Sequence, residues 1–214
     1  LGIDKHVPVA GGMGGGSADA AATLVAVDAL WGTNLGAKTL HRLAADLGAD
    51  VPFALHGGTA IGLGKGDVLS PVLATGHFEW VLVTCAEGLS TPEVFLQLDR
   101  HRSEHSIDIE TVPVEPEIEP ELLHALRAGD ALAVAEYVRN DLQAAALQLK
   151  PELGDVLEFG ETHGALAGIV SGSGPTVAFL AADDTAALAL VDAFTAERRK
   201  AMRVISPVHG ARVH

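Results

Sequence analysis

The sequence is short of cysteine, of positive charge and of long apolar runs. Cys85 is the only cysteine in 214 residues, so no disulfide can form within the chain, and we expect a reducing compartment, the cytoplasm. Lysine and arginine number 14 against 28 aspartates and glutamates, and this net charge of −14 argues against nucleic acid or a membrane surface as a partner. No apolar run approaches the roughly 20 residues of a membrane span.

The length and composition are those of a globular chain with a core. The 214 residues, 48% of them apolar, suit one large or two small domains, and we find no internal repeat and no low-complexity segment. Leu1 is not a natural start, so the sequence reads as if it begins in the middle of a domain.

One glycine-rich stretch organises the chain. Residues 8–21 read Pro-Val-Ala-Gly-Gly-Met-Gly-Gly-Gly-Ser-Ala-Asp-Ala-Ala, and Ser17 is a suitable N-cap for a helix over residues 18–31. Glycine amides approach a ligand closely and allow a positive φ, which we expect at Gly15. A helix N-terminus adds free N–H donors and partial positive charge. The stretch therefore predicts an anion site, most plausibly for nucleotide phosphates.

The two common glycine-rich nucleotide motifs do not account for this stretch. A Walker A loop ends in Gly-Lys-Ser/Thr, whereas Gly16 is followed directly by Ser17, and the dinucleotide fingerprint requires a glycine at position 17. A glycine-rich turn that caps a buried helix is the alternative to a phosphate loop. The order of proline, five glycines, serine and small residues resembles the second motif of the GHMP kinases, with Met13 in place of the usual leucine.

This resemblance implies that the loop binds ATP, with Mg²⁺ carried by the nucleotide. Ser17 can cap the helix, contact a phosphate or lie near Mg²⁺, and these roles are compatible. Asp19 is expected in the first helical turn, where it complements the helix dipole or, alternatively, holds magnesium through water. The residues implied in ATP binding are Pro8, Val9, Ala10, Gly11, Gly12, Met13, Gly14, Gly15, Gly16, Ser17 and Ala18.

Hydrophobic periodicity and turn residues predict the remaining elements. In the first half we expect helices over residues 18–31 and 37–47, an extended connector at 50–53 stiffened by Pro52, and a strand over 59–63. In the second half we expect strands over residues 80–86, 168–170, 176–180 and 202–208. Residues 101–120 are predicted to form a loop or insert. Helices are expected over 91–98, 121–128, 130–138, 142–149, 152–163 and 184–200.

The second half follows a βαββαβ order with extra helices inserted, which is ferredoxin-like. The fold class is therefore α+β. The GHMP resemblance implies an N-terminal part like domain 2 of ribosomal protein S5, over residues 1–78 and truncated at its start. It implies a ferredoxin-like C-terminal part over residues 79–214, with the active site in the cleft between the two parts.

Further motifs resemble one member of the GHMP family. They are Gly-Ala-Asp-Val-Pro at 48–52, Thr91-Pro92 followed by Phe95, Asn-Asp-Leu at 140–142 and Ser-Gly-Ser-Gly-Pro-Thr at 171–176. The resemblance covers nearly the whole chain. It implies an ATP-dependent kinase acting on the 2-hydroxyl of a small cytidine-diphosphate-linked sugar alcohol, on the non-mevalonate route to isoprenoids.

Asp50 is the candidate catalytic residue. Phosphoryl transfer needs positioning, charge neutralisation and a group that orients or deprotonates the acceptor hydroxyl. A carboxylate on a rigid turn near a phosphate loop can accept that proton. The alternative is that Asp50 hydrogen-bonds backbone at a helix exit, as aspartates in turns often do.

The resemblance also implies a substrate-binding set. Phe95 is expected to stack on the cytosine base, and the alternative is that Phe95 belongs to the core face of a short amphipathic helix. The glycine turn at 171–176 supplies candidate amide donors near the transferring phosphate. The set comprises Thr91, Pro92, Phe95, Gly172, Ser173 and Gly174.

Two features of the sequence limit the predicted function. The ten histidines are scattered, so no metal site formed by protein side chains is predicted, and oligomeric state is not predicted either. The family places a first motif with a lysine ahead of the glycine loop, and only a few residues precede the loop here. We therefore expect residues 1–214 alone to lack kinase activity and to expose apolar surface on helices 18–31 and 37–47. The alternatives are another GHMP kinase, of homoserine or mevalonate type, and a non-catalytic nucleotide-binding protein.

Overall fold

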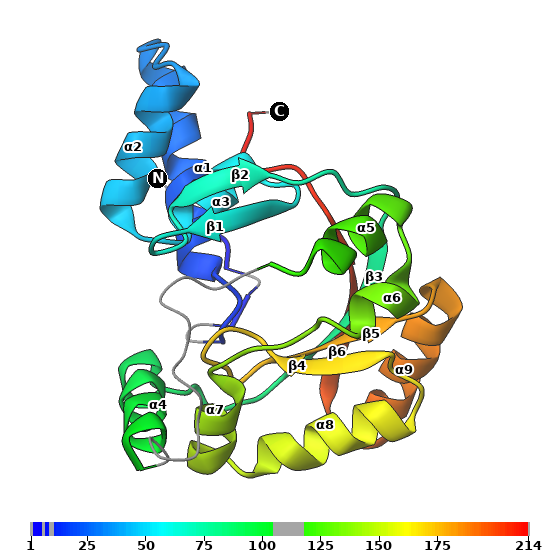
Figure 1. Cartoon of the computed structure of the whole chain (residues 1–214). Coiled ribbons are helices and arrows are strands. Elements are labelled where there is room, and N and C mark those ends of the chain that lie inside the picture. Colours follow the sequence, from blue (N-terminus) through cyan, green and yellow to red (C-terminus); the bar gives the residue numbers. More distant parts are fainter. Residues whose placement is uncertain (1, 6, 9–10, 105–117, 214) are drawn as a thin grey trace. The chain divides into compact units, whose positions relative to one another are not determined.

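The computed structural model describes residues 2–5, 7–8, 11–104 and 118–213 (Figure 1). Their contacts form two compact units that interleave along the chain. The first comprises the described residues of 2–8, 14–74 and 206–213, and the second those of 11–13 and 75–205. The division into domains at residue 78 stays a prediction.

The first unit is a small helical layer with a two-stranded sheet. Helix α1 (Gly15–Trp31), α2 (Ala37–Leu47) and α3 (Val51–His56) precede β1 (Ala60–Leu63) and β2 (Val68–Pro71), which pair antiparallel. The fully buried side chains of its core are few and small: Ala21, Ala44 and Val51. The bounds predicted for the second helix, 37–47, are confirmed.

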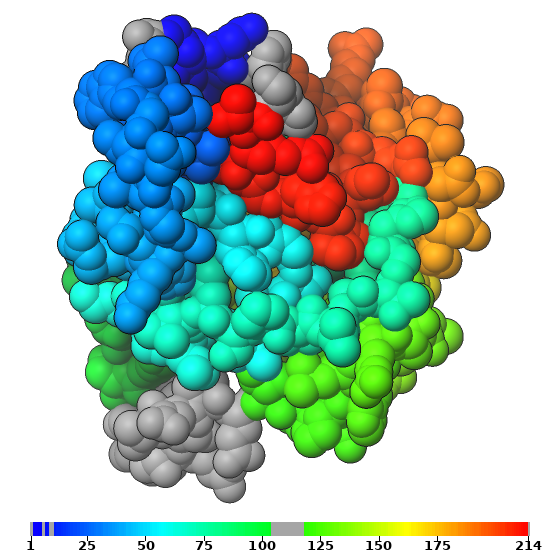
Figure 2. Space-filling view, turned by 90° about the horizontal axis from the view of Figure 1, so that it is seen from above, coloured from blue at the N-terminus to red at the C-terminus, as the bar shows by residue number. Residues whose placement is uncertain are grey.

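The end of the chain returns to this first unit. The N–H of Gly58 donates to the carbonyl of Val208 at 2.7 Å, and the N–H of Ala211 donates to the carbonyl of Ala54 at 3.0 Å. Figure 2 shows this terminal segment in red beside the blue and cyan residues of α1 to β1. The last strand runs from Lys200 to Ser206, two residues earlier than the predicted 202–208, because residues from Pro207 onward leave the sheet for these contacts.

The second unit is built on a four-stranded sheet in the order β4-β5-β3-β6. Its strands are β3 (Phe78–Thr84), β4 (Ala167–Val170), β5 (Val177–Ala181) and β6 (Lys200–Ser206). The first strand of the unit, β3, therefore lies between the third and the fourth, and β4 and β5 form the predicted hairpin. The expected ferredoxin-like arrangement is confirmed.

Helices of the second unit cover one face of this sheet. Figure 1 shows α8 (Glu152–Thr162) and α9 (Asp184–Ala196) beside the sheet, and one buried cluster joins Val81 of β3 and Phe179 of β5 to residues of both helices. The remaining helices are α4 (Thr91–Glu104), α5 (Pro120–Ala128), α6 (Ala131–Ala135) and α7 (Gln143–Leu149). On β3 the buried residues Val81 and Val83 recur at the period of two of a strand, whereas all five residues of β5 are buried, as suits a strand in the interior of the sheet.

Several predicted boundaries are wrong. Residue Val51 is helical rather than extended, because Pro52 sits in the first turn of α3, where a missing N–H costs nothing. Helix α4 continues past residue 98 to Glu104, and β2 was not predicted. Asp183 rather than Asp184 caps α9, since its carboxylate accepts from the N–H of Ala186. Residues 105–117 of the predicted loop lie outside the described residues.

The exposure expected on the first two helices is confirmed. Leu30 and Trp31 at the end of α1 are 78% and 72% exposed, and Leu47 at the end of α2 is 60% exposed. Within the described residues, no helix is both long and apolar enough to cross a membrane.

Candidate active site

The start of α1 forms an open cradle of backbone amides. Gly14 is the N-cap, with φ of 61°, and the N–H of Ala18 makes the first intrahelical bond, to the Gly14 carbonyl at 2.9 Å. The amides of Gly15, Gly16 and Ser17 precede that bond and have no partner within the helix. A Cβ added at Gly14 or Gly16 would meet no atom within 4 Å. This arrangement fits a bound phosphate.

Two details of this cradle differ from the prediction. Ser17 is the third helical residue and not the N-cap, because the left-handed turn at Gly14 starts the helix three residues earlier. Gly15 has no positive φ, and its Cβ would meet Lys5 Nζ at 3.2 Å and Val7 Cγ1 at 3.3 Å. The positive φ angles of the loop are at Gly12 and Gly14.

Lys5 is a cation at this cradle that sequence reasoning missed. Its ammonium forms an ion pair with Asp19, and both side chains are about one third exposed. Asp19 lies beyond the first turn of α1, so its predicted role there is wrong, and its carboxylate instead holds Lys5 beside Gly15. A lysine three residues before Pro8, in a chain with few cations, is the signal that was available.

The beginning of the glycine loop is fixed to the β4–β5 hairpin. The hydroxyl of Ser171 donates to the Gly12 carbonyl at 2.7 Å, and the N–H of Thr176 donates to the Gly11 carbonyl at 3.3 Å. A Cβ at Gly12 would lie 2.3 Å from the carbonyl oxygen of Ser171. Only glycine therefore fits at position 12. Val9 and Ala10 lie outside the described residues, while Pro8, Met13 and Ala18 flank these contacts in the chain.

The hairpin turn brings two predicted substrate residues together. The hydroxyls of Thr91, at the start of α4, and Ser173 lie 2.7 Å apart, and Ser173 is only 8% exposed. Gly172 and Gly174 on either side of Ser173 have φ of 57° and 79°. The turn therefore presents its backbone in a conformation that glycine favours.

Phe95 is not a core residue. Its side chain is 51% exposed, whereas Val94 and Leu98 fill the buried side of α4 at 0% and 8%. Pro92 occupies the second position of the helix. The core interpretation of Phe95 is thus wrong, and the ring is accessible to a ligand.

Asp50 precedes α3 as its N-cap residue. Its backbone has φ of −86° and ψ of −13°, and its side chain makes no capping hydrogen bond to the helix. The carboxylate is exposed. The alternative, in which Asp50 serves as a backbone-bonding turn residue, thus finds no support in this geometry, and the carboxylate is accessible to an acceptor hydroxyl.

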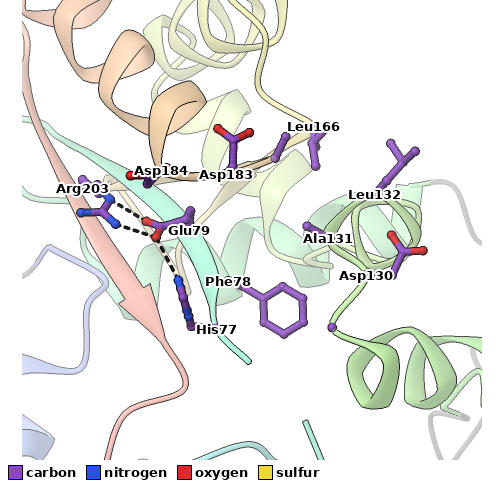
Figure 3. A pocket seen from close by; sticks show the side chains of 12 residues that line it. His77, Phe78, Glu79, Asp130, Ala131, Leu132, Leu166, Asp183, Asp184 and Arg203 are labelled. Carbon is purple, nitrogen blue, oxygen red and sulfur yellow. Dashed lines mark hydrogen bonds and ion pairs between the residues drawn. The ribbon is translucent and has the colours of Figure 1, made fainter. Parts of the chain in front are cut away.

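A separate cavity of about 580 Å³ lies at the other ends of β4 and β5 from the hairpin turn (Figure 3). Glu79, only 4% exposed, accepts two hydrogen bonds of 2.6 Å from Arg203, and His77 Nε2 lies 3.4 Å from one of its oxygens. The Arg203 hydrogen bonds hold the pKa of Glu79 below its usual value, against the opposing effect of burial. Among the residues that the structure describes, no three His, Cys, Asp or Glu side chains gather in a group suited to a metal ion.

The chain belongs to the GHMP kinases. Residues 1–58 match the family's N-terminal domain and residues 122–200 match its C-terminal domain. Among curated relatives, the chain is 62% identical to the 4-diphosphocytidyl-2-C-methyl-D-erythritol kinase of Leifsonia xyli subsp. xyli, over all of this chain and 70% of the relative. It is 60% identical to the kinase of the same name from Clavibacter michiganensis subsp. michiganensis, over 100% of this chain and 68% of that protein.

Solved structures agree on the fold. A crystal structure of 4-(cytidine 5'-diphospho)-2C-methyl-D-erythritol kinase matches with a TM-score of 0.74 and 31% identity, over 94% of this chain and 68% of that one. Homoserine kinase from Cytophaga hutchinsonii matches with a TM-score of 0.72, over 97% of this chain and 69% of that one, but at 19% identity. The second likeness shows the fold alone.

Proposed function

We propose that the chain carries the activity of an ATP-dependent kinase that phosphorylates the 2-hydroxyl of 4-diphosphocytidyl-2-C-methyl-D-erythritol, in the non-mevalonate route to isoprenoid precursors. The observation that carries the proposal is 62% identity to a kinase of that name along the whole chain, glycine loop and hairpin turn included. The homoserine kinase likeness, at 19% identity, does not favour the alternative substrate class.

The nucleotide side of the proposal rests on the cradle at α1. The amides of Gly15, Gly16 and Ser17 bind phosphate oxygens of ATP, and Lys5 adds positive charge beside them. ATP supplies the phosphoryl group and brings Mg²⁺ with it, which spreads the charge that develops in transfer. Open space at Gly14 and Gly16 is the feature that fits a ligand of this kind.

The acceptor side rests on Asp50 and on the second unit. Asp50 accepts the proton of the 2-hydroxyl as the bond to phosphorus forms. Phe95 stacks on the cytosine ring, while Thr91, Ser173 and the amides of Gly172 and Gly174 hold polar groups of the substrate. Pro92 shapes the start of α4. The proposed partner of the protein is therefore a small-molecule substrate, not nucleic acid or a membrane, and its proposed location is the cytoplasm.

Product analysis tests the reaction itself. The protein, prepared at the full length of its relatives, is incubated with ATP, Mg²⁺ and 4-diphosphocytidyl-2-C-methyl-D-erythritol, and phosphorus NMR locates the new phosphate. We expect a monoester on the 2-hydroxyl with one ADP formed per product. ADP formation without a phosphorylated alcohol, or phosphate on another hydroxyl, would contradict the proposal.

A further inference from the structure

Asn140, which is not among the predicted site residues, forms hydrogen bonds to the β4–β5 hairpin. It lies between α6 and α7, and its side-chain amide donates to the carbonyls of Val170 at 2.8 Å and Gly172 at 2.7 Å. Its side-chain oxygen accepts from the N–H of Leu142 at 3.0 Å. Both amide hydrogens and the oxygen are therefore in use, which fixes the side chain in one orientation.

A second amide side chain, that of Gln143, contacts the same strand end. Gln143, the first residue of α7, accepts the N–H of Val170 at 2.9 Å. Val170 ends β4, so its carbonyl is bonded by Asn140 before α7 and its N–H by Gln143 at the start of α7. The strand end is thus positioned from outside the sheet as well as by its pairing with β5.

The turn held in this way makes two further contacts. Ser171 donates to Gly12 of the glycine loop, and Ser173 meets Thr91 at the start of α4. Gly172 accepts from Asn140 and lies between those two serines. The turn contains two glycines with positive φ, and such a segment has many alternative conformations unless its neighbours restrict it.

We propose that Asn140 is a positioning residue for the kinase reaction. Asn140 fixes the hairpin turn, and the turn positions two groups of residues. These are Gly11 and Gly12 on the nucleotide side, and Ser173 and Thr91 on the acceptor side. The inference rests on the proposed function for its meaning in catalysis. Its structural content does not, because the hydrogen bonds from Asn140 to Gly172 and from Ser171 to Gly12 join groups of this chain alone.

The test replaces Asn140 by aspartate, which keeps the shape but removes both donors and sets a carboxylate against two carbonyl oxygens. The readout is amide hydrogen exchange by NMR, without ligand, at Thr176, whose N–H reports the docking of Gly11. We expect exchange at Thr176 to be at least tenfold faster in Asn140→Asp. Asn34→Asp is the matched control, because the Asn34 side chain donates only to the nearby Gly32 carbonyl, and it should change nothing at Thr176.

Exchange at buried Leu190 of α9 separates positioning from general loss of stability. Equal acceleration at Leu190 and Thr176, or less than a twofold change at Thr176, overturns the inference. If Asn140→Asp does not fold, Ser171→Ala removes the last link only and should still accelerate Thr176. If Ser171→Ala does not accelerate amide exchange at Thr176, the inference is overturned as well.

Kinetics then connect the inference to the reaction. Asn140→Asp should raise the KM for ATP and for the acceptor at least tenfold each, with a smaller effect on kcat, because binding groups are displaced while the proton acceptor is untouched. A loss confined to kcat overturns the inference. A wild-type protein that fails to phosphorylate the cytidyl alcohol contradicts only the proposed function, since the exchange results stand without it.

Discussion

At the scale of the residue, the account depends on a few side chains and glycines whose surroundings differ from what their types alone suggest. Lys5 is held next to Gly15 by Asp19, Phe95 is exposed on α4, and the side chain of Asp50, the N-cap residue of α3, makes no capping hydrogen bond.

Gly14→Val tests the phosphate cradle. The φ of 61° at Gly14 is unfavourable for a β-branched residue, so the turn that starts α1 should rearrange and ATP affinity should fall at least tenfold, as calorimetry would measure. Gly32, at the other end of α1, has φ of 62° and equally open surroundings. Gly32→Val should therefore lower the melting temperature similarly but leave ATP affinity within twofold. Equal ATP affinities for both variants would refute the cradle.

Asp50→Asn tests the proposed proton acceptor. Turnover should fall by about 10²–10⁴, the usual size of a general-base contribution, with affinities for ATP and substrate within about tenfold of wild type. Asp46→Asn on α2 is the control, because that carboxylate is also exposed and has a distant partner, Arg42, at 3.7 Å. Near-normal turnover of Asp50→Asn would make Asp50 a structural residue.

Phe95→Ala tests the base-stacking surface. Loss of a stack worth about 1–3 kcal/mol should raise the KM for the cytidyl substrate by a factor of about 5 to 160, with little effect on the KM for ATP. Leu96 is the adjacent residue and is 56% exposed, against 51% for Phe95, so Leu96→Ala should change neither constant. Equal effects of Phe95→Ala on both substrates would count against stacking.

At the scale of the element, the sequence predicted what depends on local pattern and missed what depends on distant contacts. Helix α2 and the β4–β5 hairpin follow from periodicity and glycine turns. The start of α1 at Gly15 was missed because a preference for Ser17 as N-cap competes with a left-handed Gly14, and only the folded backbone decides. Val51 was missed because the restriction before proline is weaker than the preference for proline in a first turn.

For the candidate site too, the local motifs were predicted from the sequence and the long-range contacts were missed. The glycine loop and the Ser-Gly-Ser-Gly-Pro turn could be recognised as motifs, and the structure shows Ser171 bonded to Gly12 across 159 positions of sequence. Three contacts were not predicted, because each joins residues that no local periodicity relates. They are that bond, the Lys5–Asp19 ion pair and the hydrogen bonds from Asn140 to the hairpin.

The buried pair between β3 and β6 gives an element-scale prediction. The folded-state pKa of Glu79 is lowered, so its contribution to stability is present above the unfolded-state pKa, near 4.3, and is lost as pH falls through the folded-state value. Arg203→Leu leaves a buried carboxylate without its main partner and should lower the urea midpoint markedly at pH 7.

The difference in urea midpoint between wild type and Arg203→Leu should narrow as pH falls below about 4.3 and through the lowered folded-state pKa of Glu79, because protonation removes the charge that pairs with Arg203. Arg42→Leu removes an exposed arginine, 68% accessible, and should leave the midpoint nearly unchanged at each pH. A midpoint difference for Arg203→Leu that is constant with pH would show that the ion pair is not its source.

At the scale of the whole molecule, the residues of the proposed site are divided between the two units. The first carries the α1 cradle, Lys5 and Asp50, and the second carries the start of the glycine loop, the hairpin turn and Phe95. The chain spans 70% and 68% of two of the curated relatives it matches. Its first unit buries few large side chains and exposes Leu30, Trp31 and Leu47, so we expect residues 1–214 to associate in solution, which size-exclusion chromatography would show.

The central claim is the identity of the acceptor, and competition between acceptors tests it most directly. The measurement is kcat/KM with ATP for 4-diphosphocytidyl-2-C-methyl-D-erythritol, homoserine and mevalonate, made on the protein at the full length of its relatives. The account predicts a preference of at least 10³-fold for the cytidyl-linked alcohol, because only that substrate has the cytosine base on which Phe95 is proposed to stack. Comparable or higher kcat/KM for homoserine or mevalonate would contradict it.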